Sequence, residues 1–164
     1  ITVKYESLRS PEENQQQEPK SSEELLSEQN RESLKQERLS IEAFIKQNDF
    51  TMMRTGSGLY YMRINESRNP MPIAVEDEIE YAYRISLLDG TPIRNSVEDG
   101  NRFIRVGKDQ VEIGLHEAFL LMNLGERMLF IIPAHLAHGI SQNEDDVPPR
   151  STLLYELEPL KKLN

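Results

Sequence analysis

The sequence predicts an α+β fold in which a short helix packs on one face of an antiparallel sheet. Residues 79–87 alternate apolar side chains with polar or small ones, which is typical of a half-buried strand. Two further runs, RMLFIIP at 127–133 and STLLYELEPL at 151–160, predict buried strands. Between them, HEAFLLMNL at 116–124 spaces its apolar residues as a helix does. Many strands together with one central helix imply this class.

The length and the charge limit the function classes. A chain of 164 residues fits one domain of about 100–150 residues plus an arm. The formal charge of −9 disfavours nucleic-acid binding, because an acidic protein repels phosphate backbones. The sequence has no cysteine, which excludes disulfides, thiolate catalysis and zinc-thiolate sites within it.

The first 49 residues predict an extended segment and a helical arm. Residues 1–20 are expected to be extended or disordered, because a short alternating stretch is followed by two prolines and a glutamine run. A helix is expected over 21–49, since Ser21 and Glu24 have the spacing of a capping box. Its second half gathers apolar residues that should dock on the domain, at Leu34, Ile41, Phe44 and Ile45. The polar first half favours either a solvated arm or a dimerisation helix.

Residues 50–164 are expected to form the folded domain, and their elements follow in order. GSGLYYMRI at 56–64 predicts a strand, and Asp89-Gly90 predicts the turn that follows the strand at 79–87. FIRVG at 103–107 predicts a further short strand, and Gly125 a left-handed cap for the helix at 116–124. The polar stretch 135–150 predicts a long loop before the last strand.

Conventional catalytic motifs are weak in this sequence. His135 and His138, with Asp145 or Asp146, give no third ligand at a recognised interval, so a metal site is not predicted. There is neither a G-x-S-x-G nucleophile elbow nor a GxxxxGK phosphate loop. Aromatic and aliphatic residues near the strand ends indicate an apolar pocket for a peptide or a small ring. The alternative is that all of them are simply core.

Four stretches of the domain, taken together, carry a family resemblance. They are SGLYYMRI (57–64), VEDEIEYAYRISLLDGTPIRNS (75–96), VGKDQVEIGLHEAFLLMNLGERMLFIIPAHLAHG (106–139) and VPPRSTLLYELEPL (147–160). In this order they resemble the FKBP-type peptidyl-prolyl cis-trans isomerases. The resemblance implies an antiparallel sheet of about five strands wrapped on one short helix at 114–124. The acidic helical arm makes the chain most similar to the gliding-motility-associated bacterial lipoprotein branch.

The resemblance also implies a chemistry that needs no acid, base, metal or cofactor. Rotation about an X–Pro bond crosses a barrier of about 18–20 kcal/mol that comes from amide resonance. An apolar pocket would disfavour the planar, charge-separated amide and hold the twisted one. The implied substrates are proline-containing polypeptides, namely unfolded or assembling envelope proteins. The alternative is a non-catalytic FKBP-like chaperone or protein-binding module with a degenerate pocket.

The resemblance assigns pocket residues position by position. Tyr83, Val111 and Tyr155 match the family, while Ile93 and Leu115 are apolar substitutes. Glu112 is expected to act through its backbone N–H, and His138 through a hydrogen bond to a substrate carbonyl. Together these seven residues form the predicted catalytic set. The residues expected to contact substrate around them are Arg94, Phe103 and Val147.

Location and assembly are also implied by the resemblance. Members of that branch are tethered to an envelope lipid through an N-terminal cysteine, which this chain lacks. We therefore expect a protein of the bacterial periplasm or cell envelope, with any tether formed by a residue outside this chain. We expect neither nucleic acid nor metal as a partner, and either a monomer or an arm-mediated dimer.

Overall fold

The computed structural model describes residues 19–137 and 147–164. The expectations for residues 1–18, His138 and the two aspartates 145 and 146 lie outside the described residues. The chain divides into two compact units, one that ends at Gln36 and one that comprises Glu37–Asn164.

The predicted arm is a helix, α1, at Ser22–Gln47. Its start is a capping box, because the Ser21 hydroxyl accepts a hydrogen bond from the Glu24 N–H at 3.3 Å. In return, the Glu24 carboxylate accepts one from the Ser21 N–H at 3.2 Å. Leu34 was expected to join the docking stripe, but its side chain is 53% exposed. The apolar contacts of α1 therefore begin after the first half of the helix.

The last turns of α1 belong to the second unit. Ile41 is buried in a cluster with Tyr60 and Ile131, and Phe44 and Ile45 pack against that cluster. Glu37 adds two hydrogen bonds, because its Oε1 accepts from the Ala134 N–H and from the Thr152 hydroxyl, both at 2.7 Å. The boundary between the units thus falls inside α1, whereas the sequence placed the start of the domain at residue 50.

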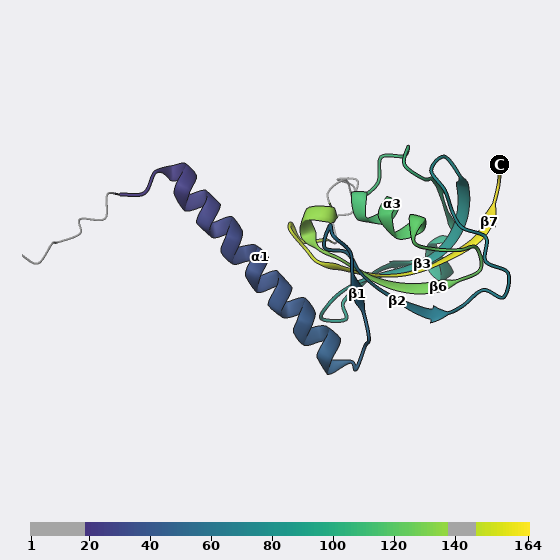
Figure 1. The fold of residues 1–164 in the computed structure, drawn as a ribbon, viewed down its shortest axis with the longest axis horizontal. Helices are drawn as coiled ribbons and strands as arrows, with labels where there is room; N and C mark the ends of the chain where they lie inside the picture. Colours follow the sequence, from purple (N-terminus) through teal and green to yellow (C-terminus); the bar gives the residue numbers. More distant parts are fainter. Residues whose placement is uncertain (1–18, 138–146) are drawn as a thin grey trace, which may run out of the picture. The chain divides into compact units, whose positions relative to one another are not determined.

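The sheet is antiparallel throughout, with strand order β1-β2-β6-β7-β3-β4, and β5 pairs with β3 beside β4. Figure 1 shows these strands with the helix α3 over one face. In the described part of the chain the sheet has seven strands, two more than the expected five, because β1 and β4 are too short for an alternation pattern. The strands are β1 Met53–Arg54, β2 Tyr60–Asn65, β3 Glu78–Leu87, β4 Pro92–Asn95, β5 Arg102–Arg105, β6 Arg127–Ile132 and β7 Leu153–Lys162.

Three short helices connect the strands. They are α2 at Ser96–Asp99, α3 at Ile113–Leu120 and the 3₁₀ turn η1 at Ala134–Leu136. The predicted helix at 116–124 therefore starts earlier and ends earlier. Leu121 and Met122 donate to carbonyls three residues back, which tightens and ends the helix. Gly125 is left-handed as expected, with φ of 81°, but it lies in the following turn and donates to Pro159.

The two faces of the sheet have different covers. The inward side chains of β3, Ile79, Tyr81, Tyr83 and Ile85, are buried in one core cluster with Phe119 and Leu115 of α3. The opposite face carries Ile131 of β6 and receives Ile41 of α1. The predicted α+β class, with the short helix on one face of an antiparallel sheet, is therefore confirmed. Within the described residues, no helix has both the length and the apolar character needed to cross a bilayer.

Asp77 joins the start of β3 to the end of β7. Its carboxylate accepts from the Ala74 N–H at 2.9 Å and contacts Lys162 Nζ at 3.0 Å. The hydrogen bond from the Ala74 backbone, and then the one from Lys162, hold the pKa of Asp77 below its ordinary value. The ionised carboxylate is therefore the form that the fold stabilises.

We expect Asp77→Asn to lower the free energy of unfolding at pH 7 by about 1–2 kcal/mol. Because folding lowers the pKa of Asp77, its contribution is complete above the unfolded-state pKa of about 3.9. It is lost as the pH falls through the lower, folded-state pKa. Urea titrations between pH 7 and pH 2 measure this. Glu76→Gln is the control, since the Glu76–Lys108 pair is exposed on both sides. A deficit for Asp77→Asn that stays constant down to pH 2 would contradict the assignment.

Candidate functional site

The predicted pocket residues meet on the inner face of the sheet. Tyr83 of β3, Leu115 of α3 and Tyr155 of β7 are each at most 4% exposed and belong to one apolar cluster. Ile93, Val111 and Val147 are half-buried and pack against the same cluster. Six of the ten predicted residues therefore lie together, on elements far apart in sequence. Such a group can receive an apolar ring at its half-buried margin.

Glu112 enters this group with its side chain, which the sequence analysis did not predict. The residue is 6% exposed, and its Oε1 accepts a hydrogen bond from the Tyr155 hydroxyl at 2.5 Å. Glu112 immediately precedes α3, yet its side chain makes no capping bond there. Its backbone N–H donates to none of the described residues. Glu112 thus offers both a free N–H and a buried carboxylate.

Tyr83 is the second polar feature of the site. Among the described residues, its hydroxyl is the one buried side-chain oxygen or nitrogen without a hydrogen-bond partner. The Arg102 guanidinium lies over its ring, with Cζ 4.5 Å from the ring centroid. Burial raises the pKa of Tyr83 above its ordinary value, and the positive charges of Arg102 and Arg94 act against that rise. The hydroxyl therefore stays protonated at neutral pH.

Phe103 was predicted to contact substrate, and in the structure it lies outside the apolar cluster. Its side chain is 63% exposed and lies on the opposite side of β5 from the buried Ile104. Since side chains alternate along a strand, Arg102 shares the inward side with Ile104. The register of the chain near 102–104 decides whether Arg102 or Phe103 faces Tyr83, because a shift of one residue exchanges the two faces of a strand. The sequence pattern alone does not fix this register.

Two further aromatic residues, Tyr81 and Phe119, lie beside Tyr83 in the core cluster. The Tyr81 ring lies 6.0 Å from that of Tyr83 and 4.8 Å from that of Phe119, edge to face. Burial raises the pKa of Tyr81 well above its usual range. The period-two pattern could have found Tyr81, because it lies two residues before Tyr83 on the same face.

His116 holds the loop that leads to Val111 and Glu112. Its Nδ1 accepts from the Gly107 N–H at 2.8 Å, and its Nε2 lies 2.9 Å from the Asp109 carbonyl. His135 lies elsewhere, with Nε2 2.8 Å from the Ser57 carbonyl. Within residues 19–137 and 147–164, no three His, Cys, Asp or Glu side chains group together as a metal site would require.

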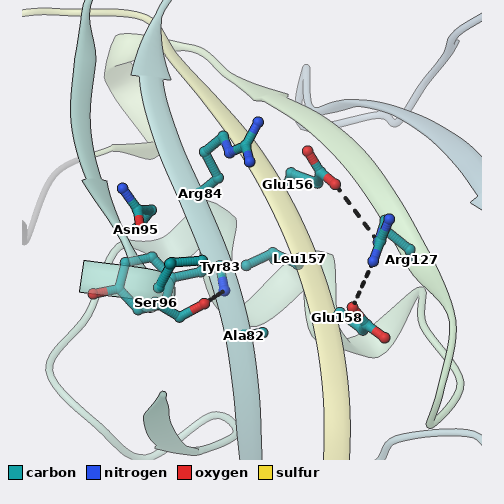
Figure 2. Close-up of a pocket in the computed structure, with 10 residues that line it drawn as sticks. Ala82, Tyr83, Arg84, Asn95, Ser96, Arg127, Glu156, Leu157 and Glu158 are labelled. Carbon is teal, nitrogen blue, oxygen red and sulfur yellow. Dashed lines mark hydrogen bonds and ion pairs between the residues drawn. The ribbon is translucent and has the colours of Figure 1, made fainter. Parts of the chain in front are cut away.

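A separate hollow lies against the strands near Arg84, and Figure 2 shows it. It measures about 210 Å³. Asn95 and Ser96 line one side and Arg127 and Glu158 the other, and the Ser96 hydroxyl accepts from the Tyr83 N–H at 3.1 Å. Arg127 contacts Glu156 at 3.6 Å and Glu158 at 3.1 Å. A second hollow, of about 610 Å³, is lined by Arg94. The two hollows share four lining residues, Arg84, Asn95, Val97 and Glu156. Tyr83 lines the smaller hollow, and neither lining includes Leu115 or Tyr155.

Comparison with known proteins supports the family resemblance over most of the domain. The sequence pattern of the family described as FKBP-type peptidyl-prolyl cis-trans isomerase matches residues 70–160. The FKBP-type 22 kDa peptidyl-prolyl cis-trans isomerase of Escherichia coli (strain K12) is 35% identical over 109 residues, which are 66% of this chain and 52% of that protein. Peptidyl-prolyl cis-trans isomerase FKBP9 of Homo sapiens is 34% identical over 86 residues. That match covers 52% of this chain and 15% of the human protein.

The solved structures support the fold. The crystal structure of FkpA from Escherichia coli superimposes with a TM-score of 0.64 at 22% sequence identity. The superposition covers 85% of this chain and 65% of that one. At this identity the likeness is one of fold. The curated relatives are longer proteins, and the chain spans between about a seventh and about a half of the length of the two named above.

We expect Tyr83→Phe and Tyr155→Phe to affect stability differently. Removing the Tyr83 hydroxyl deletes a buried donor that has no partner, so stability should stay the same or rise by up to about 1 kcal/mol. Removing the Tyr155 hydroxyl leaves the buried Glu112 carboxylate without this donor, which should cost about 1–3 kcal/mol. Thermal and urea unfolding of the two variants measure this. A larger loss for Tyr83→Phe than for Tyr155→Phe would show that the hydrogen bonding is assigned wrongly.

Proposed function

Because the chain belongs to the FKBP-type peptidyl-prolyl cis-trans isomerase family, we propose that it catalyses the cis–trans isomerisation of X–Pro bonds in polypeptides. The observation that carries this proposal is the joint burial of Tyr83, Leu115 and Tyr155, with Val111 at the margin of the same cluster. All four residues fall within the matched stretch 70–160. We also propose that proline-containing polypeptides are the substrates and partners of the whole protein.

The proposed mechanism uses the apolar surroundings of the bound X–Pro amide and one hydrogen bond to its carbonyl oxygen. The planar X–Pro amide is more polar than the twisted form, so transfer onto the apolar surface around Leu115 and Tyr155 lowers the barrier to rotation. The free N–H of Glu112 donates to the carbonyl oxygen of the substrate and holds it during rotation. No bond to the substrate is made or broken, and no proton is transferred.

Two charged groups favour the second candidate function, a chaperone or protein-binding module that keeps the fold without the rate. The Glu112 carboxylate is buried among the pocket residues, and the Arg102 guanidinium covers the Tyr83 ring. Both make the pocket more polar, which weakens the desolvation on which rotation depends. Isomerisation that is no faster than the spontaneous reaction, together with suppression of aggregation of an unfolded proline-rich protein, would favour this candidate.

We expect Glu112→Pro to reduce kcat/KM by about tenfold or more relative to Glu112→Ala. Both variants lack the carboxylate, and only the proline variant lacks the N–H. The backbone tolerates proline here, because φ of Glu112 is −55° and ψ is 137°. NMR exchange spectroscopy on a proline tetrapeptide measures the rates, and circular dichroism checks the folding of both variants. Equal rates for the two would show that the N–H has no role.

The finer expectations from the sequence also stay proposals. We propose that the protein acts on envelope proteins in a bacterium of the gliding-motility type, and that a residue outside this chain provides any lipid tether. Cell fractionation with the full-length protein tests this, and a wholly cytosolic distribution would contradict it. Four exposed leucines of α1 support self-association through the arm, Leu25, Leu26, Leu34 and Leu39. Light scattering that gives a monomer mass at all concentrations would contradict that.

A further inference from the structure

Glu37 of α1 holds together two segments that flank the candidate site. Its Oε1 accepts hydrogen bonds from the Ala134 N–H and from the Thr152 hydroxyl, both at 2.7 Å. Ala134 begins η1, and Thr152 immediately precedes β7. Glu37 is 97 and 115 residues away from these two donors in the sequence, and it lies outside the stretch 70–160 that matches the family. The family pattern therefore assigns no role to this contact.

The docked face of α1 fixes the position of the Glu37 carboxylate. Ile41 follows Glu37 by four residues, so the two side chains lie on the same side of the helix. Ile41 is 1% exposed and belongs to a cluster against which Leu154 of β7 packs. Glu37 is itself half-buried. Its carboxylate is thus held against the end of β6 and the start of β7 by the same apolar contacts that dock the helix.

The turn η1 connects the first of these hydrogen bonds to the floor of the site. Leu136 of η1 is 6% exposed and belongs to the core cluster that contains Leu115. The next residue, Ala137, donates its N–H to the Ala134 carbonyl at 3.2 Å and packs against the same cluster. The acceptor of the Ala134 N–H, which is Glu37, therefore helps to set where Ala137 meets the cluster.

A short turn connects the second hydrogen bond to Val147. The Ser151 hydroxyl donates to the Pro148 carbonyl at 2.5 Å and so closes this turn. Val147 precedes the turn and Thr152 follows it. Val147 is half-buried and packs against the core cluster. A restraint on Thr152 therefore restrains Val147 as well.

We propose that Glu37 is a positioning residue of the isomerase site, which sets Ala137 and Val147 at the margin where the proline-containing segment binds. This inference rests on the proposed function, because a bound polypeptide gives these two side chains their role. Glu37 acts only through them and takes no part in the rotation. Contacts at the margin are made with the planar and the twisted amide alike, so their loss weakens binding without slowing the bound complex. The functional unit thus includes the last turns of α1.

The test separates binding from turnover in the full chain. NMR titration with a proline tetrapeptide gives the Kd, and exchange spectroscopy at saturating peptide gives the isomerisation rate of the complex. We expect Glu37→Ala to raise the Kd by about fivefold and to leave the saturated rate within about twofold of that of the unsubstituted protein. Circular dichroism sets a temperature at which each variant is folded. An unchanged Kd for folded Glu37→Ala would show that Glu37 serves the fold alone and would overturn the inference.

Conservative variants assign the effect to the shared oxygen atom. Glu37→Gln keeps Oε1 as an acceptor for both donors, so its Kd should stay within about twofold of that of the unsubstituted protein. Thr152→Val removes the hydroxyl and should raise the Kd, whereas Thr152→Ser keeps the hydroxyl and should not. These two Thr152 variants carry the test if Glu37→Ala does not fold.

A double variant tests whether the two residues act through one hydrogen bond. Glu37→Ala combined with Thr152→Val should raise the Kd by less than the product of the two single effects, because each change removes the same contact. Effects that multiply in full would overturn the assignment. Glu42→Ala is the matched control, since Glu42 lies on the same helix and pairs with Arg38 where both side chains are at least half exposed. A rise in Kd for Glu42→Ala equal to that for Glu37→Ala would also overturn it.

The failure of this inference is distinguishable from failure of the proposed function. Accelerated isomerisation with a Kd that does not respond to Glu37→Ala or Thr152→Val would retain the isomerase and overturn the positioning role. Binding that depends on Glu37 without acceleration would support the positioning role and favour the non-catalytic module. The absence of both binding and acceleration in the unsubstituted protein would overturn both.

Discussion

The close approach of α3 to β6 is the constraint on which the site depends. A Cβ atom at Gly114 would lie 2.7 Å from Ile132 Cγ2 and 3.2 Å from the Leu136 carbonyl oxygen, so the helix can lie this close only with glycine there. This contact places Leu115 in the core and brings Glu112 to Tyr155. His116 then fastens the preceding loop to Gly107 and Asp109. One short helix therefore sets the floor of the site, its free N–H and the position of its carboxylate.

The site combines an apolar scaffold with two charged side chains, Glu112 and Arg102, that act at different places. Glu112 is satisfied internally by Tyr155, so its burial is compensated and it binds two elements of the fold together. The Arg102 guanidinium lies over the Tyr83 ring on another side of the same core cluster. The Glu112–Tyr155 hydrogen bond thus closes a polar contact within the protein.

Strand β3 and the start of α1 show where sequence reasoning succeeds. Alternation over 79–87 gave the strand and its buried face, and the Ser21–Glu24 pair gave the start of the helix. Both signals are local, because they depend on residues two or three positions apart. The end of α3 was missed, since the chain turns away after Leu120 to pair Asn123 with Pro72, a contact that no local pattern encodes. The strand β1 was missed because two residues carry no period.

The sequence by itself determined the α+β class, the inward face of β3 and the list from which the pocket residues come. Periodicity and family motifs fix which side of an element is apolar, and burial of apolar surface then dictates that those sides meet. Only the tertiary structure decided that Arg102 and not Phe103 faces Tyr83, and that the Glu112 side chain turns inward. Both outcomes depend on register and on partners about 20 to 40 residues away, which are set when the strands pair and the helix docks.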